Sequence, residues 1–249
     1  MPSEFETIVL DHPDWASRAA DIFSKSAIDC VTNHGRFAVA LSGGSTPRPV
    51  HRLLGQEPYR SDIPWTGTHL FWVDDRCVPE TSPASNFGAA KEDFLGHISI
   101  PASQIHPMPV EAPFADGARQ YEQELRESFA TDQEAFPAFD LMFLGIGQDG
   151  HTASLFPGHD ALDERQRWVV AVKGGTPNVS RLTMTLPVLN RAREIVFLVA
   201  GKGKASVTKA ILEKSAIGLP AQRIQPLNGR LMWLMDGEAS SLLSKKVTF

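Results

Sequence analysis

Residues 139–154 read FDLMFLGIGQDGHTAS, an apolar run that breaks into a glycine-rich loop. A short apolar run bounded by glycines is typical of a buried strand, and the glycines let the backbone turn tightly and approach a ligand closely. Gly145, Gly147 and Gly150 also have the G-x-G-x-x-G spacing of a dinucleotide-binding loop. The stretch therefore predicts a strand that ends at a ligand-binding turn, and its surroundings decide which ligand is bound.

The flanking sequence argues against a nicotinamide or flavin. A dinucleotide loop opens a helix of several turns, and the strand that follows ends in Asp or Glu. Here Pro157 and Gly158 interrupt any helix after the loop, and the next apolar run, 167–172, is followed by Lys173 and glycines. We therefore assign the glycines to a tight turn beside another kind of ligand.

Asp149 and His151 are the reactive residues of this loop. An imidazole that titrates near neutrality is the usual general base, and a neighbouring carboxylate can fix its tautomer and stabilise its charged form. The alternative is that His151 caps a short helix and that Asp149 is an ordinary turn residue. The two residues alone leave both interpretations open.

Short apolar runs alternate with helical patterns along the rest of the chain. This order predicts an α/β fold, a single domain over 1–249 whose mostly parallel sheet is covered by helices on both faces. The predicted strands are 8–10, 36–44, 69–76, 139–147, 167–172, 181–186, 193–201 and 231–236. The predicted helices are 13–35, 46–54, 85–95, 115–129 and 204–213, with a further short helix at the C-terminus.

Four of the predicted strands end in polar or glycine-rich segments. These segments are 42–46, 74–76, 145–151 and 201–204. Ligands of open α/β sheets bind at the carboxyl ends of the strands, so we expect the four segments to meet at one site.

The segment LSGGSTPRPV (41–50) predicts an anion site. A strand ends there, glycines and hydroxyls follow, and a helix begins; backbone N–H groups in that arrangement favour phosphate. No Gly-Lys-Ser/Thr follows, so the segment is not a nucleotide-triphosphate loop and a sugar phosphate is the better ligand. The residues concerned are Gly43, Gly44, Ser45 and Thr46. The alternative is a plain helix cap by Ser45 or Thr46.

Cations accompany the other strand ends. Arg76 follows Asp74 and Asp75, and an arginine suits bidentate recognition of phosphate. Lys204 stands at the start of a predicted helix, and Arg181 enters a predicted strand. The alternatives are a surface ion pair for Arg76 and a surface position for Arg181.

Composition excludes several functions. The chain has 249 residues, a net charge of −5 and no basic stripe, so we expect no nucleic-acid partner. No apolar run has the length of a membrane span, and the N-terminal sequence lacks a signal-peptide core. Cys30 and Cys77 indicate reduced thiols, and we expect a cytoplasmic protein. No Cys/His cluster suggests a metal, and Ser42 and Ser45 lie in no Gly-x-Ser-x-Gly motif, which disfavours a serine hydrolase.

Taken together, these motifs resemble the glucosamine-6-phosphate isomerase/6-phosphogluconolactonase family, and within it the lactonases. The resemblance covers about residues 36–226. Its pieces are LSGGSTP, WVDDRCVPETSPASNFG, DLMFLGIGQDGHTASLFPGH, RLTMTLPVLNRAREIVFLVAGKGKA and PAQRIQP. Asp75 stands where the family commonly has Glu, and Arg76 stays in register.

The resemblance implies an ester hydrolase without metal or cofactor that opens 6-phospho-D-glucono-1,5-lactone in the oxidative pentose phosphate pathway. His151 would activate water, with Asp149 orienting it, and Asp74 would face the sugar hydroxyls. Either Gly43–Gly44 or Gly145–Gly147 would supply N–H groups to the oxyanion. The phosphate set would be Ser45, Thr46, Arg76, Lys204 and Arg181.

Two other functions stay open at this point. One is a deaminase or isomerase acting on an amino sugar phosphate, although such relatives carry an acidic stretch where this chain has TASLFPG after His151. The other is a sugar-phosphate sensor, which would place a DNA-binding helix-turn-helix before the sugar-binding part; the predicted helix 13–35 has no basic face. The sequence also leaves open whether the chain is a monomer or a dimer.

Overall fold

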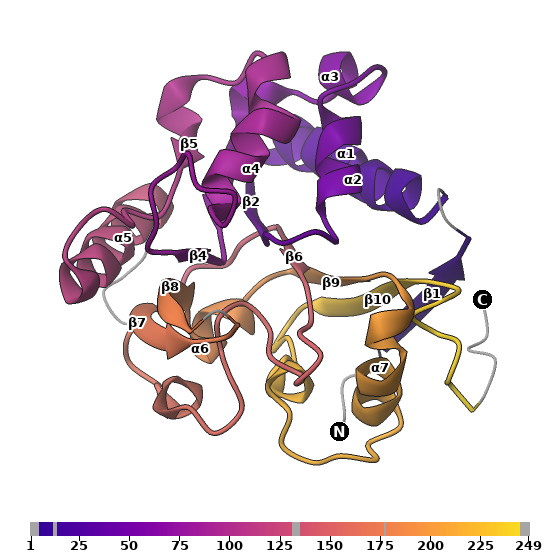
Figure 1. Cartoon of the computed structure of the whole chain (residues 1–249). Coiled ribbons are helices and arrows are strands. Elements are labelled where there is room, and N and C mark those ends of the chain that lie inside the picture. The colour runs from indigo at the N-terminus through magenta and orange to yellow at the C-terminus, as the bar shows by residue number, and fades with distance from the viewer. Residues whose placement is uncertain (1–4, 12–13, 131–134, 177, 245–249) are drawn as a thin grey trace.

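The computed structural model describes residues 5–11, 14–130, 135–176 and 178–244 (Figure 1). Seven strands form one sheet in the order β1-β10-β9-β6-β2-β3-β5, and every neighbouring pair is parallel. The strands are β1 (Phe5–Leu10), β2 (Phe37–Leu41), β3 (Thr68–Trp72), β5 (Ile105–His106), β6 (Leu141–Leu144), β9 (Glu194–Val199) and β10 (Arg230–Asp236). The predicted α/β class with a mostly parallel sheet is confirmed.

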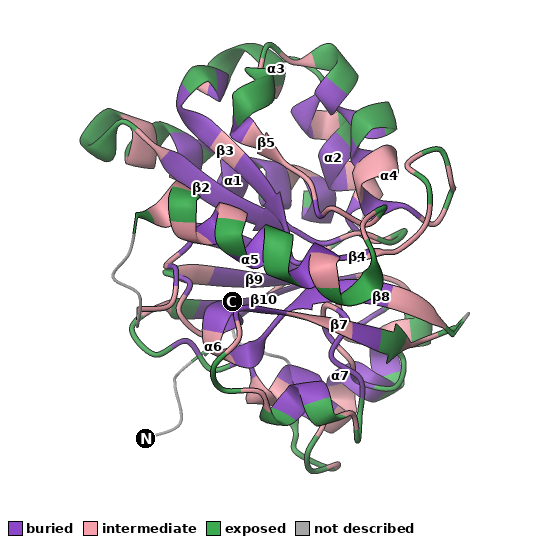
Figure 2. Cartoon of the chain, turned by 90° about the vertical axis from the view of Figure 1, so that its left-hand side faces the viewer, coloured by how far each residue is buried: buried purple, intermediate pink, exposed green. Residues whose placement is uncertain are grey.

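Helices cover both faces of this sheet. The longer helices are α1 (Asp14–His34), α2 (Arg48–Leu54), α4 (Asn86–Asp93), α5 (Phe114–Phe129) and α7 (Ala205–Leu212), and α3 (Tyr59–Asp62) and α6 (Leu186–Leu189) are single turns. Figure 1 shows α1 to α4 on one side of the sheet and α7 on the other. In Figure 2 the central strands are buried, whereas the outer faces of the helices are exposed. Within the described part of the chain, none of the helices is long and apolar enough to cross a membrane.

Aromatic side chains fill the space between these layers. Trp15 and Phe23 of α1 are fully buried, and the Phe23 ring meets Phe37 of β2 edge-on at 5.4 Å between centroids. On the other side, Phe197 and Trp233 of β9 and β10 stack at 4.1 Å. Each such pair adds about 0.5–1.5 kcal/mol beyond the burial of its surface, so these contacts stabilise the packing of the core.

A second sheet corrects the prediction of one strand over residues 69–76. The chain leaves the parallel sheet after Trp72, and β4 (Asp74–Arg76) joins a small antiparallel sheet with β8 (Val179–Met184) and β7 (Val169–Gly174). Val73 lies at the junction: its N–H donates to Leu41 at 3.0 Å, and its carbonyl accepts from Met184 at 2.8 Å. Hydrophobic periodicity could not reveal this change of sheet, because Val73 continues the apolar run of β3 and no glycine or proline separates it from Asp74.

The predicted C-terminal helix is also wrong over the part of the chain described. Residues 237–244 form turns after β10, and residues 245–249 lie outside the described part. The sequence also missed α3, α6 and β5, which contain only two to four residues each. Elements this short carry too few residues to establish a period.

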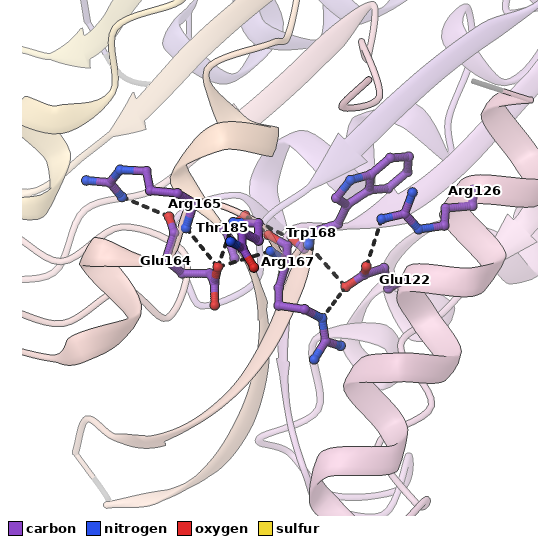
Figure 3. Close-up of polar contacts among 8 residues, drawn as sticks. Glu122, Arg126, Glu164, Arg165, Arg167, Trp168 and Thr185 are labelled. Carbon is purple, nitrogen blue, oxygen red and sulfur yellow. Dashed lines mark hydrogen bonds and ion pairs between the residues drawn. The ribbon is translucent and has the colours of Figure 1, made fainter. Parts of the chain in front are cut away.

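Glu122 of α5 joins that helix to the small sheet (Figure 3). Its carboxylate accepts from Arg126 at 3.0 Å, from the Arg167 side chain at 2.8 Å and from the backbone N–H of Trp168 at 3.1 Å. Burial opposes ionisation, but these donors outweigh it and hold the pKa of Glu122 below its ordinary value. The carboxylate therefore stays charged and fixes α5 beside the start of β7.

His51 of α2 is a buried histidine outside the polar site. Its ring lies 5.3 Å from that of Phe94, and neither ring nitrogen has a hydrogen-bond partner among the described residues. Burial lowers the pKa of His51 to about 4. An unfolded chain therefore takes up a proton, at a pKa of about 6.5, before the folded chain does. The free energy of unfolding should fall as the pH drops from about 6.5 towards 4.

We expect His51→Leu to remove this pH dependence. The stability of the variant relative to the wild type should rise by about 2 kcal/mol between pH 7 and pH 5, because the native protein no longer excludes a proton there. Urea unfolding at both pH values measures this difference. His97→Leu, at an exposed position, is the matched control. Parallel pH profiles for wild type and His51→Leu would contradict the assignment.

Candidate active site

The four polar strand ends meet at one cavity of about 190 Å³ at the carboxyl edge of the parallel sheet. The cavity therefore confirms that these strand ends converge. It is lined by Ser42, Gly43, Gly44, Ser45, Thr46, Asp74, Arg76, Asn86, Gly145, Ile146, Gly147, His151, Ala153, Arg181 and Lys204. Asp149 is the one predicted site residue that does not line the cavity; it contacts His151, which does.

The loop after β6 presents His151 and Asp149 as a hydrogen-bonded pair. His151 Nδ1 lies 2.6 Å from Asp149 Oδ1, and the same oxygen accepts the His151 backbone N–H at 3.1 Å. The turn closes on itself, since the Gly147 N–H donates to the His151 carbonyl at 2.8 Å. Gly150 takes a φ of +83°, a conformation that favours glycine. The helix-cap interpretation of His151 is not what the structure shows.

Asp149 determines which nitrogen of His151 is free. Burial disfavours the charged carboxylate, but the His151 N–H and the attraction of its ring outweigh burial and hold the pKa of Asp149 below its ordinary value. An ionised Asp149 accepts a proton-bearing Nδ1, so the neutral imidazole keeps a lone pair on Nε2. Nε2 has no hydrogen-bond partner within the described residues. The pair can therefore act as a base towards a molecule in the cavity.

Two neighbours hold the His151 ring. Gly147 lies directly against the pair, and a Cβ built on it would overlap the imidazole and the Asp149 carboxylate. On another side, the Phe156 ring lies 4.8 Å from the His151 ring. The glycine spacing that resembled a dinucleotide loop thus makes room for a histidine, and Phe156, within the TASLFPG stretch, restricts how that histidine can turn.

Three cations line the cavity, and none forms an ion pair with a carboxylate within the described residues. Each is held instead by a neutral backbone carbonyl. Arg76 donates to Ala84 O at 3.1 Å, Arg181 to Gly174 O at 3.1 Å, and Lys204 to Ile146 O at 2.6 Å. Their positive charge is therefore available to an anion.

Arg181 is a buried residue of the site, so its alternative surface position is wrong. It is 4% exposed and pairs with Arg76 across β8 and β4. Burial, and then the charge of Arg76, lower the pKa of Arg181 from its ordinary value. Burial also lowers the pKa of Lys204, against the opposing effect of Asp149. Cations that are partly desolvated and repel one another are strongly stabilised when an anion binds between them.

The two acids of β4 have different surroundings. Asp74 lines the cavity and accepts from Ser154 Oγ at 2.5 Å, which ties β4 to the loop that carries His151. Asp75 points away and accepts the backbone N–H groups of Arg76, Asn86 and Phe87 at 2.7–3.0 Å. Burial outweighs these bonds and raises the pKa of Asp75 to about 6. Asp75 therefore has a structural position at the start of α4.

The loop after β2 brings uncommitted donors to the cavity. Gly44 has a φ of +90°, and the backbone N–H groups of Gly44 and Ser45 have no protein acceptor within the described residues. The hydroxyl of Ser42, by contrast, is already engaged, since it donates to Phe143 O at 2.7 Å. Free N–H groups beside cations are a ready anion site.

Sequence reasoning missed Asn86 as a site residue. It is 3% exposed, lines the cavity and contacts Arg76 and Asp74. Its signal was its place in the motif WVDDRCVPETSPASNFG, but a lone Asn after Ser also fits an ordinary helix start. Among the described residues, no group of three or more His, Cys, Asp or Glu could hold a metal ion.

The comparisons with known proteins agree with this geometry. Residues 11–233 match the family model described as glucosamine-6-phosphate isomerases/6-phosphogluconolactonase, and the chain belongs to this family. Its relatives include the 6-phosphogluconolactonase of Synechocystis, 43% identical over 89% of this chain and 94% of the relative. The 6-phosphogluconolactonase of Rattus norvegicus is 40% identical over 90% of this chain and 88% of its own. The solved 6-phosphogluconolactonase of Thermotoga maritima superposes with a TM-score of 0.81 at 28% identity, covering 94% of this chain and all of that one.

We expect Gly147→Ala to break the His151–Asp149 pair, because the added methyl group overlaps both side chains. The His151 Nδ1–H signal, followed by proton NMR of ¹⁵N-labelled protein, should shift or vanish. Gly145→Ala is the matched control, since a Cβ at Gly145 meets no atom within 4 Å. An unchanged Nδ1–H signal in Gly147→Ala would show that the loop does not set the ring.

Proposed function

We propose that this chain hydrolyses 6-phospho-D-glucono-1,5-lactone to 6-phospho-D-gluconate, the lactonase step of the oxidative pentose phosphate pathway, with His151 as the general base. One observation carries the proposal. Among the described residues, a carboxylate–histidine pair whose Nε2 is free and three cations without carboxylate partners share one cavity. That combination suits a substrate with a phosphate at one end and an electrophilic carbon at the other. The relatives named 6-phosphogluconolactonase support the choice of substrate.

His151 carries the proton transfers of the proposed mechanism. Nε2 takes a proton from a water molecule as the water oxygen bonds to C1 of the lactone. Asp149, ionised and bonded to Nδ1, stabilises the imidazolium that results. When the tetrahedral intermediate collapses, the C1–O5 bond breaks and Nε2 returns its proton to O5, which becomes a hydroxyl. The enzyme ends the cycle unchanged, and the new acid ionises in water.

The oxyanion on C1 needs donors that are already in place. The Gly44 and Ser45 N–H groups, which lack protein acceptors among the described residues, suit this role better than the loop after β6. In that loop the Gly147 N–H is already bonded to the His151 carbonyl. We therefore assign the oxyanion to the loop after β2.

The phosphate lies among the cations in this proposal. Arg76, Arg181 and Lys204 would bind its oxygens, with the Ser45 and Thr46 hydroxyls completing the set. Asp74, whose carboxylate Ser154 holds, would accept from the sugar hydroxyls. Binding energy from the phosphate then positions C1 near His151 without taking part in the reaction. We predict that the protein acts in the cytoplasm. We also predict that it acts as a monomer or a dimer.

Lactone hydrolysis with His151→Gln tests the base. We expect wild type, in the presence of EDTA, to hydrolyse fresh 6-phosphogluconolactone well above its spontaneous rate, followed with 6-phosphogluconate dehydrogenase. The variant should lose about 10²–10⁴-fold in kcat, the range for a general base. Its affinity for 6-phosphogluconate should stay near that of wild type.

Three results would contradict this proposal. Normal kcat in His151→Gln would remove the base assignment. Ammonia release from glucosamine 6-phosphate without lactone hydrolysis would indicate a deaminase. Tight sugar-phosphate binding without turnover would indicate a sensor.

Arg181→Gln tests the phosphate set. Removing one of the facing guanidinium groups should raise the Kd for 6-phosphogluconate about tenfold or more, because a charge-assisted contact is lost. Isothermal titration calorimetry measures this Kd, and kcat should change much less than KM. Arg230→Gln, whose side chain is 79% exposed, is the control. Equal affinities for wild type and Arg181→Gln would exclude Arg181 from the binding site.

A further inference from the structure

We propose that Asn86 is a positioning residue that aims Arg76 at the phosphate without neutralising it. The inference rests on the proposed function, because it assigns Asn86 a task in binding that substrate. Asn86 is the first residue of α4, it is 3% exposed, and it lines the cavity. Its side chain and backbone contact every residue of β4.

The two ends of the Asn86 side-chain amide make opposite kinds of hydrogen bond. Oδ1 accepts from Arg76 Nη1 at 2.6 Å, and Nδ2 donates to the Asp74 carbonyl at 2.8 Å. Nδ2 also lies 3.4 Å from Asp74 Oδ1. The site thus requires an acceptor towards a cation and a donor towards a carbonyl and a carboxylate. A neutral amide supplies both within one planar group, and a carboxylate of the same shape does not.

The neutrality of the acceptor matters for the charge of Arg76. Arg76 is held by the Ala84 carbonyl and by Asn86 Oδ1, and it has no carboxylate ion pair among the described residues. A carboxylate at position 86 would orient the guanidinium equally well but would cancel much of its attraction for phosphate. Its negative charge would also repel the carboxylate of Asp74. Asn86 therefore orients Arg76 and leaves its charge for the ligand.

Neighbouring backbone fixes the amide in this place. A Cβ built on Gly43 would overlap the Asn86 amide, so the loop after β2 runs directly against it. The Asn86 N–H donates to Asp75 at 2.7 Å, and Ser85 caps α4 by accepting from Gly88 at 3.0 Å. The amide therefore has little room to rotate. Its hydrogen bond to Arg76 in turn restricts the orientation of the guanidinium group.

A double-mutant cycle of Asn86→Asp with Arg76→Ala tests the proposal. The readouts are kcat, KM and the Kd of inorganic phosphate and of 6-phosphogluconate by calorimetry. We expect Asn86→Asp to raise both Kd values about tenfold or more, with a smaller change in kcat. In the Arg76→Ala background the same change should raise Kd by a clearly smaller factor than in wild type, because the added charge then only repels the ligand and no guanidinium is left to orient or neutralise. Equal effects of Asn86→Asp in the two backgrounds would overturn the proposal.

Two further variants separate positioning from folding. Asn86→Ala removes the acceptor without adding charge, and it should raise Kd less than Asn86→Asp does. Ser85→Ala removes the cap of α4 but no contact with Arg76; it should lower Tm and leave Kd unchanged. If Ser85→Ala folds while both Asn86 variants do not, or if Ser85→Ala weakens phosphate binding equally, Asn86 has only a structural role.

The phosphate measurements do not depend on lactone turnover. Coupling between Asn86 and Arg76 in a protein that fails to hydrolyse the lactone would keep the positioning role and reject the proposed function. Lactone hydrolysis without coupling would do the reverse.

Discussion

The main chain of Val73 is hydrogen-bonded to both sheets, to Leu41 in the parallel one and to Met184 in the antiparallel one. The polar site depends on this junction. It turns the chain so that Asp74 and Arg76 leave the parallel sheet and pair with β8, whose Arg181 lies opposite Arg76. The parallel sheet supplies the loops that carry His151 and the free N–H groups, while the small sheet supplies two of the cations. One site is thereby assembled from two sheets that meet at Val73.

The acidic and the basic side chains of the cavity have different hydrogen-bond partners. The acids are surrounded by donors: Ser154 for Asp74, the His151 ring for Asp149. The cations are held by carbonyl oxygens, which orient a donor but do not neutralise it. Although acids and bases share a small volume, they do not form salt bridges with one another among the described residues, with the exception of the His151–Asp149 pair. An arrangement of this type remains strongly attractive to a dianion.

The sequence could predict the elements that have a regular hydrophobic period, and the ends of the strands where a ligand binds. The strands and long helices followed from periodicity, and the site followed from the rule that ligands bind where parallel strands stop. It could not predict the change of sheet at Val73, because Val73 continues the apolar run of β3 and no glycine or proline marks the junction. Nor could it show that Arg181 is buried, which depends on the pairing of β8 with β4. Asn86 was missed for a similar reason: its partners are ten and twelve residues away and meet it only through the fold.

The carbonyl groups that hold the cations belong to Ala84, Ile146 and Gly174, and every residue type has such a group. A change of side chain at Ala84 or Ile146 leaves the oxygen where it is as long as the backbone path is kept. Gly174 is more restricted, because a side chain there would overlap Phe156. Sequence drift in a lineage of such proteins can therefore alter much of the rim while the electrostatic field inside stays constant. Selection must therefore preserve mainly the backbone conformation around the cavity, together with the few side chains that carry charge.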